Sequence, residues 1–178
     1  AIALAAGQYL ATGTPSLVYL QNSGIGNTIN PLASLAHKNV YAIPMLLVIG
    51  WRGEPTVPDE PQHVTQGALT EAQLELLGIP FAVLPDSIEK AKPILDNLMY
   101  ASQREKCPAA LLVRANTFAA YPSTTKRPDL TELSKTDAID AIMKSLAPDA
   151  IVVGSTGHIS REIYALSLER DDDVTREF

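Results

Sequence analysis

Ser16-Leu-Val-Tyr-Leu-Gln-Asn-Ser-Gly-Ile-Gly-Asn27 begins as an apolar, strand-like run and ends as a small polar loop with two glycines. Apolar residues then recur at helical spacing from Thr28 to His37. Glycines let a backbone approach a ligand, and the N–H groups that open a helix favour bound anions. The loop lacks the third glycine of a dinucleotide fingerprint and the Lys-Ser/Thr of a phosphate loop. An ordinary strand-to-helix turn therefore stays open as the alternative.

Strand patterns alternate with helical patterns along the rest of the chain. Pro44–Gly50 is almost continuously apolar, which is typical of a strand covered on both faces. We expect further strands at 16–20, 80–84, 109–113 and 149–154, and helices at 1–11, 28–37, 70–77, 87–98, 134–146 and 159–169. Strands that alternate with helices predict an α/β fold with a doubly wound parallel sheet.

Residues 115–133 have the composition of a linker, including Tyr-Pro-Ser-Thr-Thr-Lys-Arg-Pro-Asp at 121–129. This linker separates a nearly complete α/β unit, residues 1–114, from the beginning of another, residues 134–178. The chain starts at Ala1 inside a helical pattern without a capping residue, and it ends at Phe178 where a strand pattern is starting. We therefore expect an internal part of a longer protein, with a fold that is incomplete at both ends.

Composition excludes several classes of partner and site. The 178 residues carry 14 basic and 20 acidic side chains without a basic cluster, so we expect neither nucleic acid nor a membrane as partner. The single cysteine, Cys107, excludes an internal disulfide and a multi-cysteine metal site, and it favours a reducing, cytoplasmic location. The apolar run Ile43–Ile49 is too short to span a bilayer.

Polar side chains are dense in three loops, Gln21–Asn27, Trp51–His63 and Ser155–His158, each of which follows a predicted strand. Ligands of an open parallel sheet bind beyond the carboxyl ends of its strands, so these loops are the candidate site. Arg52 could hold a carboxylate or phosphonate as a fork, or form a structural ion pair. His63 could handle a proton or contact substrate, or merely support its loop.

Several of these segments together resemble a known family. They are Gln21-Asn-Ser-Gly-Ile-Gly-Asn-Thr-Ile-Asn-Pro31, Ile43-Pro-Met-Leu-Leu-Val-Ile-Gly-Trp-Arg-Gly-Glu-Pro55 and Asp59-Glu-Pro-Gln-His63. They look like the pyrimidine-binding domain of the phosphonopyruvate decarboxylase family, thiamine-diphosphate enzymes close to sulfopyruvate decarboxylase. Val153-Gly-Ser-Thr-Gly-His-Ile-Ser-Arg-Glu162 is similar to the opening of that family's diphosphate-binding domain. The resemblance covers essentially the whole chain and implies the thiamine-diphosphate-binding fold.

The resemblance implies decarboxylation of phosphonopyruvate to phosphonoacetaldehyde and carbon dioxide, in the biosynthesis of phosphonates such as phosphonate antibiotics. It implies thiamine diphosphate and magnesium as cofactors, and a homo-oligomer with the cofactor at the subunit interface. Two parts of the family's machinery would lie outside this chain: a glutamate before Ala1, and a Gly-Asp-Gly…Asn segment beyond Phe178 that holds magnesium. We therefore expect the chain to be inactive alone. Sulfopyruvate decarboxylase and a non-catalytic anion-binding module are the alternatives.

The resemblance also implies roles for individual residues. His63 would be catalytic, as a substrate contact or proton relay. Arg52 would grip an anionic end of the substrate, together with Gln62, Ser23 and Asn27. The cofactor would lie against Gly24, Ile25 and Gly26 near the reacting centre, and its diphosphate against Ser155, Thr156, Gly157 and His158. No side chain of the chain is assigned to a metal.

Overall fold

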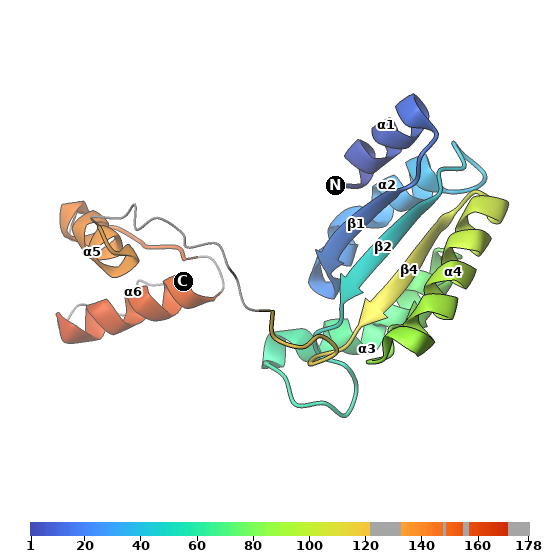
Figure 1. Cartoon of the computed structure of the whole chain (residues 1–178). Helices are drawn as coiled ribbons and strands as arrows, with labels where there is room; N and C mark the ends of the chain where they lie inside the picture. Colours follow the sequence, from blue (N-terminus) through green and yellow to red (C-terminus); the bar gives the residue numbers. More distant parts are fainter. Residues whose placement is uncertain (122–132, 148, 155–156, 171–178) are drawn as a thin grey trace. The chain divides into compact units, whose positions relative to one another are not determined.

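The structure is a computed structural model that describes residues 1–121, 133–147, 149–154 and 157–170 (Figure 1). The chain forms two compact units, residues 1–121 and 122–178. The predicted domain bounds, 1–114 and 134–178 on either side of a linker, stay a prediction. Most of that predicted linker lies outside the described residues.

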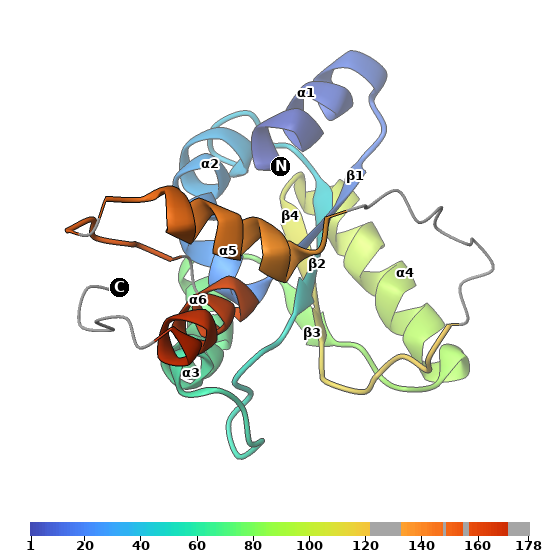
Figure 2. The ribbon, with the colours of Figure 1, turned by 90° about the vertical axis from the view of Figure 1, so that its left-hand side faces the viewer.

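A four-stranded parallel sheet forms the centre of the first unit (Figure 2). Its strands are β1 (Ser16–Gln21), β2 (Met45–Gly50), β3 (Phe81–Val83) and β4 (Pro108–Val113), arranged in the order β1-β2-β4-β3. The helices are α1 (Ile2–Thr12), η1 (Asn22–Thr28), α2 (Ile29–Pro31), η2 (Leu32–Ala36), α3 (Pro61–Leu76) and α4 (Ile88–Glu105). Because helices cover both faces of an all-parallel sheet, the predicted doubly wound α/β fold is confirmed.

Each face of the sheet has its own apolar core. Leu47, Ile49 and Leu112 lie in the larger core, with buried side chains of α1, η2 and α3. Leu46 and Leu111 face the other way and pack with Leu98 of α4. Figure 2 shows the sheet nearly edge-on, with α4 on one side and α2 and α3 on the other. We call these two sides the α4 face and the α3 face.

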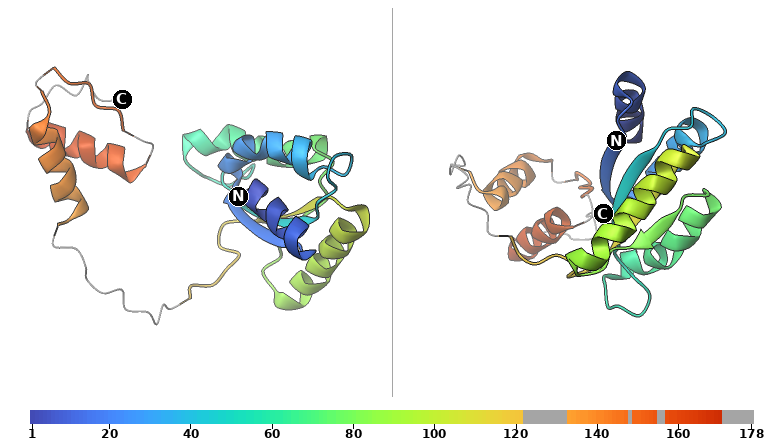
Figure 3. Two further views of the ribbon diagram at one scale, coloured as in Figure 1. Left: turned by 90° about the horizontal axis from the view of Figure 1, so that it is seen from above. Right: turned by 45° about the vertical axis from the view of Figure 1, so that its right-hand side comes forward.

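Helix α4 leaves part of the α4 face uncovered. It packs on β2, β3 and β4, and Figure 3 (right) shows it running diagonally across the sheet. On β1, the side chains of Leu17 and Tyr19 are consequently 64% and 73% exposed. Tyr19, exposed in this way, lines the pocket that is described below.

The polar stretch after β1 is helical and not the small polar loop that we predicted. Asn22–Thr28 forms a 3₁₀-helix, η1, and the expected single helix at 28–37 is divided into the rest of η1, the short α2 and the π-helical turn η2. Neither Gly24 nor Gly26 has a positive φ. The Ile25 side chain, 1% exposed, is buried in the α3-face core. The backbone around Ile25 is therefore helical and packs against the core.

Helix α3 begins at Pro61 rather than at Thr70, so its start was predicted too late. Pro61 stands in the first turn, where a proline costs no hydrogen bond because the N–H it lacks has no partner there. Gln62 and His63 therefore belong to the first helical turn and not to the preceding loop. Helix α4 also runs further than predicted, to Glu105, although its predicted cap is confirmed: Ser87 Oγ accepts from Lys90 N at 3.4 Å.

The second unit contains α5 (Lys135–Ser145) and α6 (His158–Glu169). Ser134 caps α5 by accepting a hydrogen bond from Asp137 N at 3.0 Å. The predicted strand at 149–154 is wrong, because these residues contain only an isolated bridge at Val152. A strand needs a paired neighbour for its backbone groups, and the described part of this unit contains no strand. Ile151 and Val153 are accordingly 68% and 78% exposed.

Within the described ranges, none of the helices combines the length and the apolar character that crossing a bilayer requires.

Candidate binding site at the carboxyl ends of the strands

Asn22 connects three segments at the carboxyl end of the sheet. Its Oδ1 accepts from Arg52 N at 3.1 Å, and its Nδ2 donates to Arg52 O at 2.8 Å and to Thr70 Oγ1 at 3.0 Å. The side chain is buried, as is that of Thr70. Asn22 therefore fixes the backbone of Arg52 against η1 and α3. Sequence reasoning gave it no role, because its partners lie far away along the chain.

Asp59 holds the guanidinium of Arg52. Arg52 Nε donates to Asp59 Oδ2 at 2.8 Å, and Nη2 donates to Oδ1 at 2.5 Å. The same carboxylate accepts from Gly53 N and Glu60 N, both at 2.7 Å. The structural ion pair that we considered for Arg52 is therefore present. The pair uses Nε and Nη2, and the side chain is 43% exposed, so the contact between Arg52 and an anionic substrate stays a prediction.

The pairing shifts both ionisation equilibria in favour of the charged forms. The hydrogen bonds from Arg52, and then those from the N–H groups of Gly53 and Glu60, hold the pKa of the Asp59 carboxyl far below its usual value, although desolvation acts in the opposite direction. The hydrogen bond to Asp59 likewise raises the pKa of the Arg52 guanidinium. Both side chains of the pair are therefore charged near neutral pH.

This geometry predicts a pH-dependent effect of Asp59→Asn. A carboxyl with a lowered native pKa contributes stability above its unfolded pKa of about 3.9, and that stability is lost progressively as the pH falls below it. We expect the variant to unfold at a lower urea concentration than the wild type at pH 7, with a smaller difference at pH 3. Equal differences at the two pH values would show that the carboxylate charge does not stabilise the loop.

Two glycines bring the loop after β2 into direct contact with α3. A Cβ added at Gly67 would lie 1.6 Å from Gly53 O, and one added at Gly53 would lie 2.0 Å from His63 O. Gly53 also has a φ of 66°, in the left-handed region that favours glycine. Trp51 Nε1 donates to Gly67 O at 3.0 Å. The first turn of α3 is therefore fixed against the residues that follow β2.

This contact places His63 beside the loop between β2 and α3, residues 51–60, which carries Arg52 and is called the Arg52 loop below. The Nδ1 atom of His63 is buried, and it has no hydrogen-bond partner among the described residues. Gln62, the neighbouring candidate, is exposed. The structure thus brings His63 and Arg52 to one end of the sheet, as the sequence led us to expect, while their chemical roles stay predictions.

The other predicted site residues are distributed over η1 and the second unit. On η1, Ser23 and Gly24 are half-buried, Ile25 is buried in the core, and Gly26 and Asn27 are exposed. In the second unit, Gly157 precedes α6 with a φ of 118°, and His158 is the first residue of that helix. Ser155 and Thr156 lie outside the described residues.

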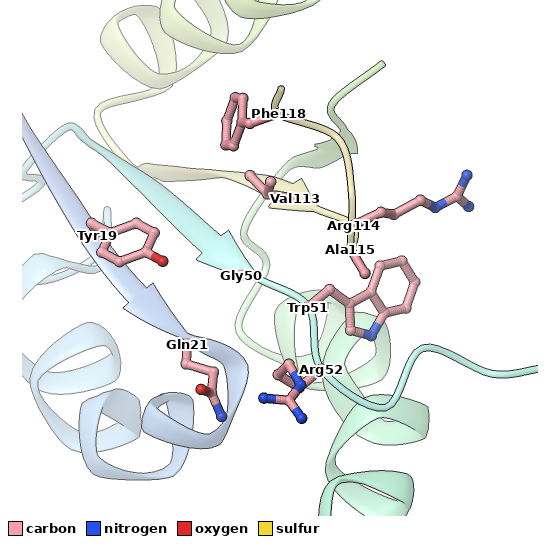
Figure 4. A pocket seen from close by; sticks show the side chains of 9 residues that line it. All are labelled: Tyr19, Gln21, Gly50, Trp51, Arg52, Val113, Arg114, Ala115 and Phe118. Atoms are coloured by element: carbon pink, nitrogen blue, oxygen red, sulfur yellow. The ribbon is translucent and has the colours of Figure 1, made fainter. Parts of the chain in front are cut away.

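A pocket of about 230 Å³ opens at the carboxyl ends of β1, β2 and β4 (Figure 4). It is lined by Tyr19, Gln21, Gly50, Trp51, Arg52, Val113, Arg114, Ala115 and Phe118. Arg52 is the predicted site residue that contributes to it. Arg114, after β4, points away from Gln21 in Figure 4, and its Nε lies 2.7 Å from Glu54 Oε1. Sequence reasoning did not name the remaining residues as site residues, although Gln21 and Trp51 each stood at the start of a selected loop.

Residues 1–121, 133–147, 149–154 and 157–170 contain no group of three or more His, Cys, Asp or Glu side chains that could hold a metal ion.

Comparison with known proteins gives a clear relationship. No family model matches the chain. It is 33% identical to a phosphonopyruvate decarboxylase of Streptomyces hygroscopicus and 30% identical to one of Streptomyces viridochromogenes, in both cases over 96% of this chain. These matches cover 45% and 46% of the two relatives, so the chain spans about half of their length. The chain is also 35% identical to the sulfopyruvate decarboxylase subunit alpha of Methanocaldococcus jannaschii, over 65% of each protein. By sequence, the chain is homologous to part of the phosphonopyruvate decarboxylases and to the sulfopyruvate decarboxylase subunit alpha proteins.

Proposed function

We propose that this protein is a thiamine-diphosphate-dependent decarboxylase that converts phosphonopyruvate into phosphonoacetaldehyde and carbon dioxide. The names of the two Streptomyces relatives support the reaction, since their similarity extends over 96% of this chain. The observation that carries the proposal is the placement of Arg52. Asp59 holds its half-exposed guanidinium, Asn22 fixes its backbone, and the residue lines a pocket beyond the strand ends.

Arg52 is best assigned to the phosphonate end of the substrate. The substrate carries a carboxylate, which leaves as carbon dioxide, and a phosphonate, which stays. A cation that held the carboxylate would stabilise the ground state more than the transition state and would slow the reaction. A guanidinium on the phosphonate anchors the substrate through the whole reaction and leaves the carboxylate free to depart. Asp59 keeps that guanidinium in one orientation.

His63 is the proposed proton-handling residue. Its buried Nδ1 has no partner among the described residues, and a bound water molecule or ligand is one way in which such a buried polar atom is satisfied. The backbone contact between Gly53 and Gly67 fixes the turn that carries it. Gln62, Ser23 and Asn27 remain proposed substrate contacts, because each bears a polar side chain near the strand ends and none is fully buried.

The residues present fit thiamine diphosphate in two places. Gly26 is exposed, and no heavy atom lies within 4 Å of an added Cβ, so a ligand can approach the backbone of Gly24–Gly26. Helix α6 begins at His158 without a side-chain cap, so N–H groups of its first turn can donate to a phosphate. Gly157 and His158 would hold the diphosphate there. When bound, the cofactor supplies the electron sink that decarboxylation requires. Magnesium, a homo-oligomeric assembly and a cytoplasmic location belong to the same proposal.

The test is an assay of the protein expressed from its complete reading frame, with thiamine diphosphate and Mg²⁺. We expect release of carbon dioxide and aldehyde from phosphonopyruvate, with a kcat/KM well above that for sulfopyruvate. The opposite preference would assign the protein to the sulfopyruvate reaction, which the similarity to the subunit alpha proteins makes the second candidate. Tight binding of phosphonopyruvate without carbon dioxide release would instead support a non-catalytic anion-binding module.

A further inference from the structure

The pocket lies over Gly50, a residue without a side chain at the end of the inner strand β2. In the parallel register, Gln21 of β1 pairs with Gly50 of β2, and Gly50 pairs with Val113 of β4. Residues in register on neighbouring parallel strands point to the same face, here the α4 face. Gln21 and Val113 therefore stand on either side of a position that has no side chain. Figure 4 shows the pocket opening over this gap.

The fold itself does not require a glycine at residue 50. Its φ is not positive, so an L side chain is compatible with the backbone. A Cβ added there would lie 3.7 Å from Tyr19 Oη and 3.9 Å from Leu20 O, which are ordinary van der Waals contacts. A side chain at this position would thus be accepted by the strand but would fill the floor of the pocket. Gly50 is explained by the open space above it.

Gln21 brings a polar group to the same end of the pocket as Arg52. Its Nε2 donates to Ser23 Oγ at 2.8 Å, which restrains the amide. In Figure 4 the Gln21 and Arg52 side chains point toward one another from neighbouring strand ends. The wall away from this polar end is formed by the aromatic side chains of Tyr19 and Phe118. This combination suits a small organic acid, with its anionic head between amide and guanidinium and its apolar stem along the rings.

We propose that this pocket is the subsite for the phosphonate head of the substrate, in which Gln21 is a hydrogen-bond donor beside Arg52 and Gly50 keeps the floor open. The choice of a phosphonate rests on the proposed function. The placement of the subsite rests on the register, the open space at Gly50 and the orientation of Gln21. The pocket lies at the strand ends, beside the α4-face residues Gln21 and Val113, and it reaches Trp51, which packs in the α3-face core with Ile25.

Trp51 makes the test direct, because it is the only tryptophan of the chain and lies in the pocket wall. Its fluorescence is followed while phosphonoacetate, a stable probe with a phosphonate and a carboxylate, is added to the 178-residue chain. We expect saturable binding. Gly50→Val should raise the Kd about tenfold or more by filling the floor, and Gln21→Glu should do so by placing a negative charge beside the anion. Gln21→Met, of similar shape, should raise it less than Gln21→Glu does.

Gly7→Val is the matched control, since Gly7 lies in α1 with no heavy atom within 4 Å of an added Cβ. This variant should bind phosphonoacetate with the Kd of the wild type. Circular dichroism checks the fold of each variant, and Gly50→Ala replaces Gly50→Val if the latter unfolds. An unchanged Kd in the Gly50 and Gln21 variants, or no saturable signal from the wild type at millimolar probe, overturns the subsite. If the protein expressed from its complete reading frame releases carbon dioxide but the Gly50 and Gln21 variants leave the Kd of the probe unchanged, the subsite alone is refuted. If the probe binds in the pocket but the protein expressed from its complete reading frame, supplied with thiamine diphosphate and Mg²⁺, releases no carbon dioxide, the proposed decarboxylation alone is refuted.

Discussion

Gly67→Ala is expected to destabilise the protein by about 3 kcal/mol or more and to lower its Tm by about 10 °C or more. The added Cβ would lie 1.6 Å from Gly53 O and 2.7 Å from Arg52 O. Backbone atoms cannot turn away as the end of a flexible side chain can, so α3 must separate from the loop after β2. Urea and thermal unfolding of the purified variant measure the loss.

The matched control is Gly7→Ala, the same substitution inside another helix. No heavy atom lies within 4 Å of a Cβ at residue 7, so alanine there should stabilise the protein by about 0.5–1 kcal/mol through its better helix propensity. The two identical substitutions thus have opposite expected signs. If Gly67→Ala were as stable as the wild type, the close contact between loop and helix would not contribute to folding.

Arg52→Ala has the largest expected effect on activity. If Arg52 anchors the phosphonate, its removal should lower kcat/KM for phosphonopyruvate at least about 30-fold, mostly through a higher KM, because a desolvated charge-assisted contact is worth about 2–5 kcal/mol. The affinity for thiamine diphosphate should stay unchanged, since the proposed cofactor contacts lie on η1 and α6. Steady-state kinetics of the protein expressed from its complete reading frame, with a cofactor titration, separate the two effects.

Asp59→Asn is the control for an indirect effect through the loop, because it weakens the ion pair while keeping the guanidinium. We expect this variant to retain most of the wild-type kcat/KM. Unchanged kinetics in Arg52→Ala would remove Arg52 from the substrate site. If Asp59→Asn reproduced the full loss, the order of the loop and not the guanidinium would be responsible.

The sheet could be predicted from the sequence because its strands are short apolar runs that are covered on one or both faces. The pattern located β2 and β4 to within about one residue, since nearly every side chain of these strands is buried. The pattern at 149–154 was equally apolar, and the prediction of a strand there was wrong. Apolar character indicates that a segment can be a strand, but a strand also needs a neighbour to pair with.

The site was less predictable, because its geometry depends on distant pairs. Arg52 was recognised as a candidate from its place after a buried strand, but its fixation by Asn22 joins residues 30 positions apart. The start of α3 was missed because Pro61 and the polar residues after it have the composition of a loop. The pocket could not be foreseen, since it depends on the register that aligns Gly50 between Gln21 and Val113.

The contact between Gly53 and Gly67 also determines where the chain can accept insertions and deletions. Residues 55–58 lie between fixed points, the Arg114–Glu54 ion pair and Asp59, so extra residues there would enlarge a surface loop and leave both ends in place. One residue inserted between 61 and 67 would turn the start of α3 by about 100° relative to its end. That insertion would carry His63 away from the Arg52 loop, so the spacing from residue 59 to residue 67 should not vary among proteins that share this site.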